Sequence, residues 1–128
     1  MALECLYNIP MPQEFTQDDL NTFLNAREKF IALIGKPKPL GEFIAKNLIH
    51  RIKNEMQDAI DNKTDLKLAL YSCHDTNLLA IMAYLDNPVN GNPPYASHIS
   101  IQLFKEDNNY FVKFFFNDEE FFADLNKL

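Results

Sequence analysis

The chain has 128 residues, 47% of them hydrophobic and 23% charged, a balance typical of a folded globular protein and not of a disordered one. Eighteen acidic and twelve basic side chains give a formal charge of −6, which argues against a general nucleic-acid binder. No apolar run is long enough to span a membrane, and two cysteines cannot by themselves form a disulfide scaffold or a four-ligand zinc site. We therefore expect a single domain over residues 1–128 that contacts neither nucleic acid nor a membrane.

Residues 1–61 are predicted to be mostly helical, after a lead-in that is punctuated by prolines. Thr16 is a candidate N-cap, and the aspartates that follow it suit the positive end of a helix dipole. Gly35 and the Lys-Pro-Lys-Pro stretch after it end this first helix. From about Leu40 to Ile60 apolar residues recur every four positions, with Phe43 widening the stripe, which predicts a second and longer helix with a buried face.

Basic residues are concentrated in these predicted helices. From Arg27 to Lys53 there are seven basic and two acidic residues, a local charge of +5. Such a stretch either forms a solvated helix face, which is the more common case, or meets an anionic partner.

Residues 62–128 are predicted to hold a central strand, a helix and a C-terminal hairpin. The run from Leu66 to Ser72 is mostly apolar, as in strands that are buried in a sheet. A helix is expected over Leu78–Leu85, followed by alternating strands around Ile99–Leu103 and Tyr110–Phe116 with an Asp-Asn-Asn turn between them. The tail from Asn117 is expected to add a helical turn.

The junction between the central strand and its helix carries the most informative residues, His74 and Asp75. Ligands of open α/β sheets bind at the carboxyl ends of strands, where helix N-termini favour anions such as phosphate. A histidine there can contact a phosphate oxygen, and a neighbouring aspartate can donate a proton. Asp75 has an equally good structural interpretation, in which it caps a helix that starts at Thr76.

The remaining histidines and the cysteine beside His74 are weaker candidates. His50 lies among apolar residues of the second helix, and His98 opens a strand. Neither belongs to a local metal-binding motif, so no metal site is expected. Cys73 matches no nucleophile signature and is interpreted as a small buried residue. Pairing of Cys5 with Cys73 stays open.

Three blocks of sequence resemble a known family. The blocks are Tyr71–Asn77 (YSCHDTN), Pro93–Ser97 (PPYAS) and Tyr110–Val112 (YFV), and the earlier stretch Leu3–Asn8 (LECLYN) is similar as well. In order and spacing they resemble the C-terminal half of histidine acid phosphatases, the acid-phosphatase branch of the histidine phosphatase superfamily.

The resemblance implies a fold, a reaction and two site residues. The fold would be α/β, a partial histidine-phosphatase-like sheet with flanking helices, in which residues 1–61 derive from the family's helical cap. The reaction would be hydrolysis of phosphate monoesters through a phosphohistidine, with no metal or other cofactor. His74 would contact the phosphate, and Asp75 would protonate the leaving-group oxygen. Family members are often secreted, periplasmic or lysosomal; the start of this chain does not read as a secretory signal, and its compartment stays open.

The departures from the family bear on activity. The family's nucleophile lies in an Arg-His-Gly motif that this sequence lacks, and Arg27 and Arg51 are its only arginines. We therefore expect a phosphate monoester or phosphate anion as ligand but little or no turnover by this chain alone. Its expected partner is another copy of itself or a missing N-terminal half. The alternative is a non-catalytic binding or interaction protein that uses the retained fold.

Overall fold

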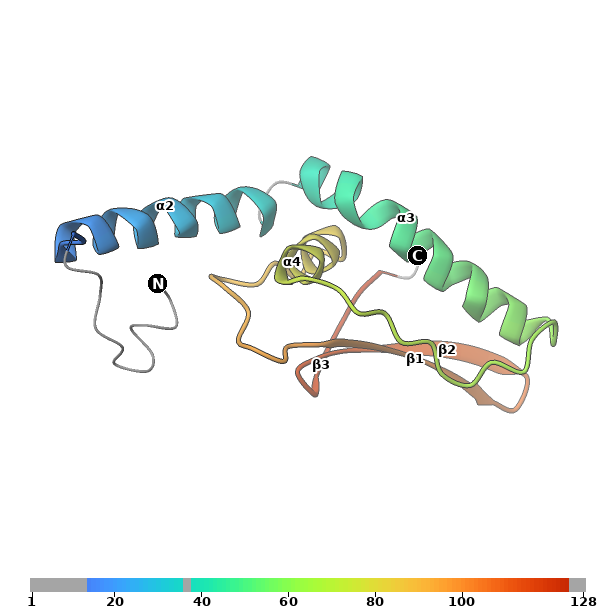
Figure 1. Ribbon diagram of the computed structural model, residues 1–128. Helices are drawn as coiled ribbons and strands as arrows, with labels where there is room; N and C mark the ends of the chain where they lie inside the picture. Colours follow the sequence, from blue (N-terminus) through green and yellow to red (C-terminus); the bar gives the residue numbers. More distant parts are fainter. Residues whose placement is uncertain (1–13, 36–37, 125–128) are drawn as a thin grey trace. The chain divides into compact units, whose positions relative to one another are not determined.

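Figure 1 shows the computed structural model of the chain, which describes residues 14–35 and 38–124. The elements are α2 (Gln17–Gly35), α3 (Lys38–Ile60), α4 (Asp75–Tyr84), β1 (Ile99–Glu106), β2 (Asn109–Phe116) and β3 (Glu119–Phe121). The chain divides into two compact units, the first ending at Phe30 and the second beginning at Ile31. The combination of helices with an antiparallel sheet confirms the predicted α/β class.

The start of α2 confirms the predicted cap. The Thr16 hydroxyl oxygen accepts a hydrogen bond from the Asp19 backbone N–H at 3.2 Å, and the Asp19 carboxylate accepts one from the Thr16 backbone N–H at 2.9 Å. This reciprocal pair satisfies two backbone donors that a helix start leaves without intrahelical partners. The hydrogen bonds from Thr16, first from its side chain and then from its backbone, lower the pKa of the Asp19 carboxyl.

In the second unit, α3 and α4 lie over the sheet (Figure 1), and the main core of this unit lies between these helices and the sheet. The buried members of this core are Ala45, Ile49, Ala80, Ile81, Leu85, Phe114 and Ala123. The predicted stripe of the long helix is confirmed at Ile49, which is 2% exposed, but is wrong at Phe43, which is 81% exposed. Phe43 precedes Ala45 by two residues, about 200° around the helix, so it lies on the opposite face.

Gly41 sets how closely α3 and α4 approach. A Cβ atom at this position would lie 3.0 Å from the Ala83 Cβ and 3.1 Å from the Ala80 carbonyl oxygen, closer than side chains normally pack. The small residues of α4 thus meet the α3 backbone directly, and this contact holds the buried helix α4 against α3.

The sheet is antiparallel with the order β1-β2-β3. Strands β1 and β2 form the predicted hairpin, in register from Ile99 opposite Phe116 to Glu106 opposite Asn109. A second hairpin replaces the helical turn expected in the tail. Asn117 and Asp118 both have positive φ, 48° and 69°, as in the tight turns that favour hairpins, and they return the chain along β2 as β3.

The central strand predicted from Leu66 to Ser72 is wrong as a hydrogen-bonded element. The segment is extended between α3 and β1 (Figure 1), yet within the described residues its backbone makes no hydrogen bond to another backbone group. Leu68 is 78% exposed and Leu70 is 89% exposed. A continuous apolar run indicates a strand buried between neighbours, but the described residues provide no neighbouring strand that pairs with it. We call residues 66–72 the extended segment.

None of the helices in the described part of the chain is both long enough and apolar enough to cross a membrane.

Candidate functional site

His74 and Asp75 lie where the extended segment leads into α4, as the sequence predicts. His74 is the N-cap residue, with φ −104° and ψ 165°, and α4 begins at Asp75. The His74 backbone N–H donates to the Asn77 side-chain oxygen at 3.1 Å, and the Asn77 backbone N–H donates to the His74 carbonyl at 3.0 Å. The start of α4 is therefore held by the backbone of His74 together with the backbone and side chain of Asn77, and His74 itself is exposed.

The alternative interpretation, in which Asp75 caps the helix, is wrong by one residue, because the cap is His74. Asp75 is the first helical residue, and its carboxylate accepts a hydrogen bond from the Thr76 backbone N–H at 2.7 Å. Its side chain thus lies at the positive end of the α4 dipole and is exposed to solvent. Both His74 and Asp75 are accessible to a ligand from outside the helix.

Cys73 immediately precedes this pair and was interpreted as a buried residue. It is exposed with a free thiol, because the segment that carries it has no covering strand. Cys5 lies outside the described residues, so the question of its pairing with Cys73 stays open.

An anchor that the sequence did not predict holds the extended segment just before His74. The Tyr71 hydroxyl donates a hydrogen bond to the Glu55 carboxylate, and the Arg51 Nε–H donates to the same carboxylate at 3.0 Å. The Arg51 guanidinium also lies 5.5 Å from the centre of the Tyr71 ring, within the range of a cation–π contact. We call Arg51, Glu55 and Tyr71 the anchor cluster.

The anchor cluster shifts the titration of its members in opposite directions. The hydrogen bond from Tyr71, and then that from Arg51, lowers the pKa of the Glu55 carboxyl. Burial, followed by the hydrogen bond to Glu55, raises the pKa of Tyr71. Both shifts move the pKa values further away from neutral pH, so the ionised Glu55 carboxylate and the protonated Tyr71 hydroxyl that form the hydrogen bond are each favoured. The spacing of Arg51 and Glu55 by four residues on a helix was the available sequence signal, but Tyr71 joins them across sixteen residues.

The other histidines belong to different elements from the His74–Asp75 pair. His50 is exposed on α3. The His98 backbone N–H donates to the Asn117 side chain at 2.9 Å, and its ring Nε2 lies 3.3 Å from an Asp118 oxygen, so it fastens the start of β1 to the β2–β3 turn. Within residues 14–35 and 38–124, no cluster of His, Cys, Asp and Glu is suited to hold a metal ion.

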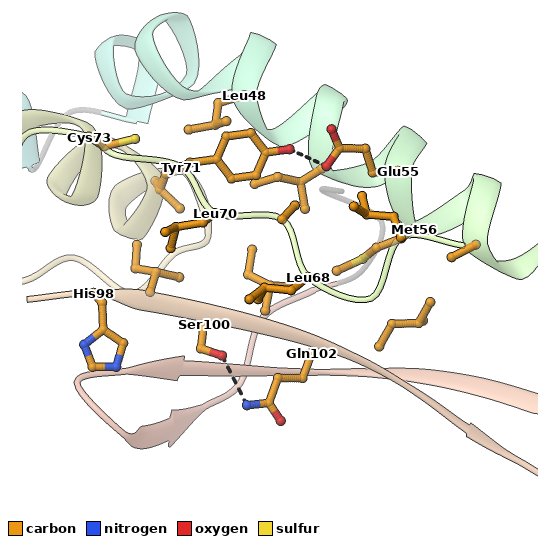
Figure 2. A pocket seen from close by; sticks show the side chains of 18 of the residues that line it. Leu48, Glu55, Met56, Leu68, Leu70, Tyr71, Cys73, His98, Ser100 and Gln102 are labelled. Carbon is orange, nitrogen blue, oxygen red and sulfur yellow. Dashed lines mark hydrogen bonds between the residues drawn. The ribbon is translucent and has the colours of Figure 1, made fainter. Parts of the chain in front are cut away.

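An open groove of about 720 Å³ runs between α3, the extended segment and β1 (Figure 2). Cys73 and His98 line one end, while His74 and Asp75 are not among its lining residues. Its walls are mainly apolar, with Glu55 and Lys67 as the charged side chains. The groove therefore follows the extended segment as far as Cys73, and the exposed His74–Asp75 pair comes directly after it in the chain.

Comparisons with known proteins identify the family of the chain. The model of the histidine phosphatase superfamily, branch 2, matches residues 7–117. The chain is 30% identical to prostatic acid phosphatase of Bos taurus and 31% identical to lysosomal acid phosphatase of Xenopus laevis, in each case over 91% of this chain. It is 23% identical to counting factor 60 of Dictyostelium discoideum over 94% of its length. The matches cover 31%, 28% and 29% of these proteins, so the chain spans about a third of the length of its relatives.

Proposed function

This chain belongs to branch 2 of the histidine phosphatase superfamily, and from that premise we propose that it carries part of an acid phosphatase site. In this proposal the His74 ring donates a hydrogen bond to a phosphate oxygen of a phosphate monoester. When a nucleophile supplied from outside this chain attacks the phosphorus atom, the bond to the leaving oxygen breaks and the Asp75 carboxyl gives that oxygen its proton. The observation that supports the proposal most strongly is that both side chains are exposed at the N-terminus of α4.

The start of a helix is a suitable place for this chemistry. Its backbone N–H groups and dipole favour an anion, and the His74–Asn77 reciprocal bonds fix the position of the first turn. The anchor cluster fixes the chain on the other side of His74, through Tyr71. A phosphate bound at this point would meet a preorganised backbone, which lowers the reorganisation needed when charge develops on the phosphoryl oxygens.

We also propose that the chain does not turn over phosphate monoesters alone. The sequence has no Arg-His-Gly motif, which supplies the nucleophile in the family it resembles. Arg51 is already bound to Glu55 and stacked on Tyr71, so it is held away from the role of a phosphate clamp. Phosphoryl transfer needs a positioned nucleophile and several donors to the phosphoryl oxygens. The non-catalytic alternative is not favoured, since the relatives above include two acid phosphatases.

A titration of the full chain with inorganic phosphate, followed by NMR of the histidine ring signals, tests the binding part of this proposal. We expect the His74 signals to shift, those of His50 to stay in place, and His74→Asn to abolish saturable binding. An unchanged His74 signal at saturating phosphate contradicts the proposal.

Hydrolysis of an aryl phosphate near pH 5 tests the catalytic part. We expect no turnover above that of a sample carrying Asp75→Asn. Turnover by the unmodified chain that this variant abolishes would show that the chain is a competent enzyme and that its nucleophile lies elsewhere in these 128 residues.

A further inference from the structure

An exposed Asn-Gly pair lies in the loop of residues 85–98, which joins α4 to β1 (yellow to orange in Figure 1). Asn90, Gly91 and Asn92 are all exposed. On one side of them Val89 packs against a buried apolar cluster, and on the other side Pro93 is buried. The three exposed residues can therefore change conformation while the fold on either side of them stays in place.

The groups that could react with each other in this pair are unoccupied. The Gly91 backbone N–H and the Asn90 side-chain amide make no hydrogen bond among the described residues. Gly91 has a positive φ of 78°, which a residue without a Cβ atom adopts without strain. A Cβ built at this position would have no other atom within 4 Å, so the space around the Gly91 backbone is open to water.

We propose that Asn90–Gly91 is a site of spontaneous chemical modification in the folded protein, at which Asn90 loses its amide. The Gly91 backbone nitrogen attacks the Asn90 Cγ atom, so that a new N–Cγ bond forms and the Cγ–Nδ2 bond breaks. The Nδ2 group leaves as ammonia and takes up the proton that the Gly91 nitrogen gives away. Water then opens the succinimide ring at one of its two carbonyls, which leaves either aspartate or isoaspartate at position 90.

The two products differ in what they present to solvent. Each adds one negative charge to the chain. In the isoaspartyl form the main chain runs through Cγ, and the α-carboxylate of residue 90 is left free on an exposed loop. That carboxylate is the kind of group that carboxyl methyltransferases esterify with the methyl group of S-adenosylmethionine. The modified loop is therefore also a methyl acceptor.

The sequence and the fold single out Asn90 among the asparagines of the loops. It is the only asparagine of the 128 residues that is followed by glycine, the residue that hinders the attacking nitrogen least. Asn87 and Asn92 each precede a proline, whose nitrogen carries no proton to give away. Asn62 precedes Lys63, whose backbone N–H donates a hydrogen bond to the Asp58 carbonyl at 2.8 Å.

The remaining described asparagines are held by hydrogen bonds or by regular structure. The Asn117 side-chain oxygen accepts the His98 backbone N–H at 2.9 Å, and its amide nitrogen donates to the Ser97 hydroxyl at 3.1 Å. Asn108 and Asn109 lie in the paired β1–β2 hairpin, and neither precedes a glycine. The others lie in helices, whose hydrogen-bond ladder engages the next backbone N–H: Asn21, Asn25, Asn47, Asn54 and Asn77.

Peptide mapping by mass spectrometry of the full chain, incubated folded at neutral pH, tests the proposal. We expect Asn90 to convert before any other described asparagine, and a more negatively charged species to appear on anion exchange. The rate should rise with pH, because the attacking nitrogen has to give away its proton. A folded chain in which Asn90 stays intact, or in which another described asparagine converts first, overturns the proposal.

Incubation in urea separates the effect of the fold from that of the sequence. Unfolding should speed conversion at Asn62 and Asn117, because it removes the hydrogen bonds that protect them. Asn90 should convert at nearly the same rate in the folded and unfolded chain. A large acceleration of Asn90 on unfolding would mean that the folded loop protects it, which overturns the proposal.

Variants of the loop give the remaining test. Asn90→Ser should abolish both the more negative species and the methyl label that an isoaspartyl methyltransferase transfers from S-adenosylmethionine. Gly91→Ala should slow conversion by about tenfold or more, because the added Cβ hinders the attacking nitrogen. Asn92→Ser is the matched control in the same exposed stretch and should convert at the rate of the unmodified chain. Label that persists in Asn90→Ser, or an unchanged rate in Gly91→Ala, overturns the proposal, which does not depend on phosphate binding at His74.

Discussion

The hydroxyl of Tyr71 donates a hydrogen bond to the carboxylate of Glu55, joining the extended segment to α3 three residues before His74. This contact is one of the few that hold the segment, since its backbone has no strand partner among the described residues. The positions of His74 and Asp75 therefore depend on a side-chain anchor on one side and on the packing of α4 on the other.

Removal of the Tyr71 hydroxyl should loosen the connection to His74. We expect Tyr71→Phe to lower Tm by roughly 2 °C, because a partly exposed hydrogen bond contributes only a fraction of its full strength. Amide exchange over residues 66–74 should become faster while that of β2 stays unchanged. Tyr110→Phe removes a hydroxyl from β2 instead and should leave exchange in the segment as it was. Equal effects of the two variants would contradict a specific anchor.

The lowered pKa of Glu55 predicts how stability depends on pH. Its folded-state pKa lies below its unfolded value, so its contribution is fully present above the unfolded pKa of about 4.3 and is lost as pH falls through the folded pKa. We expect the urea midpoint to fall between about pH 5 and pH 3. Glu55→Gln should make this fall of the urea midpoint smaller. Part of the fall should remain, because the pKa values of the Asp19 and Asp61 carboxyls are lowered as well. An identical pH profile in Glu55→Gln would contradict the role of the anchor cluster.

The close contact at Gly41 predicts a destabilising alanine. Gly41→Ala places a methyl group 3.0 Å from the Ala83 Cβ, and overpacking of this kind costs about 1–3 kcal/mol. The better helix propensity of alanine, about 0.5–1 kcal/mol, offsets only part of that cost. Gly35→Ala is the matched control, because its nearest contact would be an ordinary 3.5 Å from Leu79. In urea unfolding, Gly41→Ala should have a lower free energy of unfolding than the unmodified chain, and Gly35→Ala should have nearly the same one. The reverse order would show that α3 and α4 separate without cost.

Exposure of the Cys73 thiol predicts its reactivity. In a Cys5→Ser background, Cys73 should react with an aromatic disulfide reagent at close to the rate of an unfolded control, because its side chain is exposed. A thiol that reacts only after unfolding would contradict its exposure in the folded chain.

Features with local causes could be predicted from the sequence. The cap at Thr16 depends on a partner three residues away, and the β1–β2 hairpin depends on alternation around a turn. The position of the His74–Asp75 pair at the start of α4 was likewise predicted, and the family model confirms the resemblance that suggested its role.

Features with distant causes were missed. Whether Leu68 lies in a sheet depends on neighbouring strands that its own sequence does not encode, so the apolar run was interpreted correctly as strand-like but wrongly as paired. The partner of Tyr71 is sixteen residues away on another element. β3 depends on positive φ angles at Asn117 and Asp118 that a helical tail would not contain.

The two uncovered leucines, Leu68 and Leu70, also have a consequence for the life of the polypeptide in a cell. Open strand edges with apolar side chains are the surfaces on which chains aggregate and which chaperones and proteases recognise. A copy in which both leucines stay exposed would be cleared faster than one in which polar residues replace them. The amount of protein that survives, measured by pulse-chase labelling of the unmodified chain and of a variant that carries Leu68→Ser and Leu70→Ser, is then a property on which selection can act before any phosphate is bound.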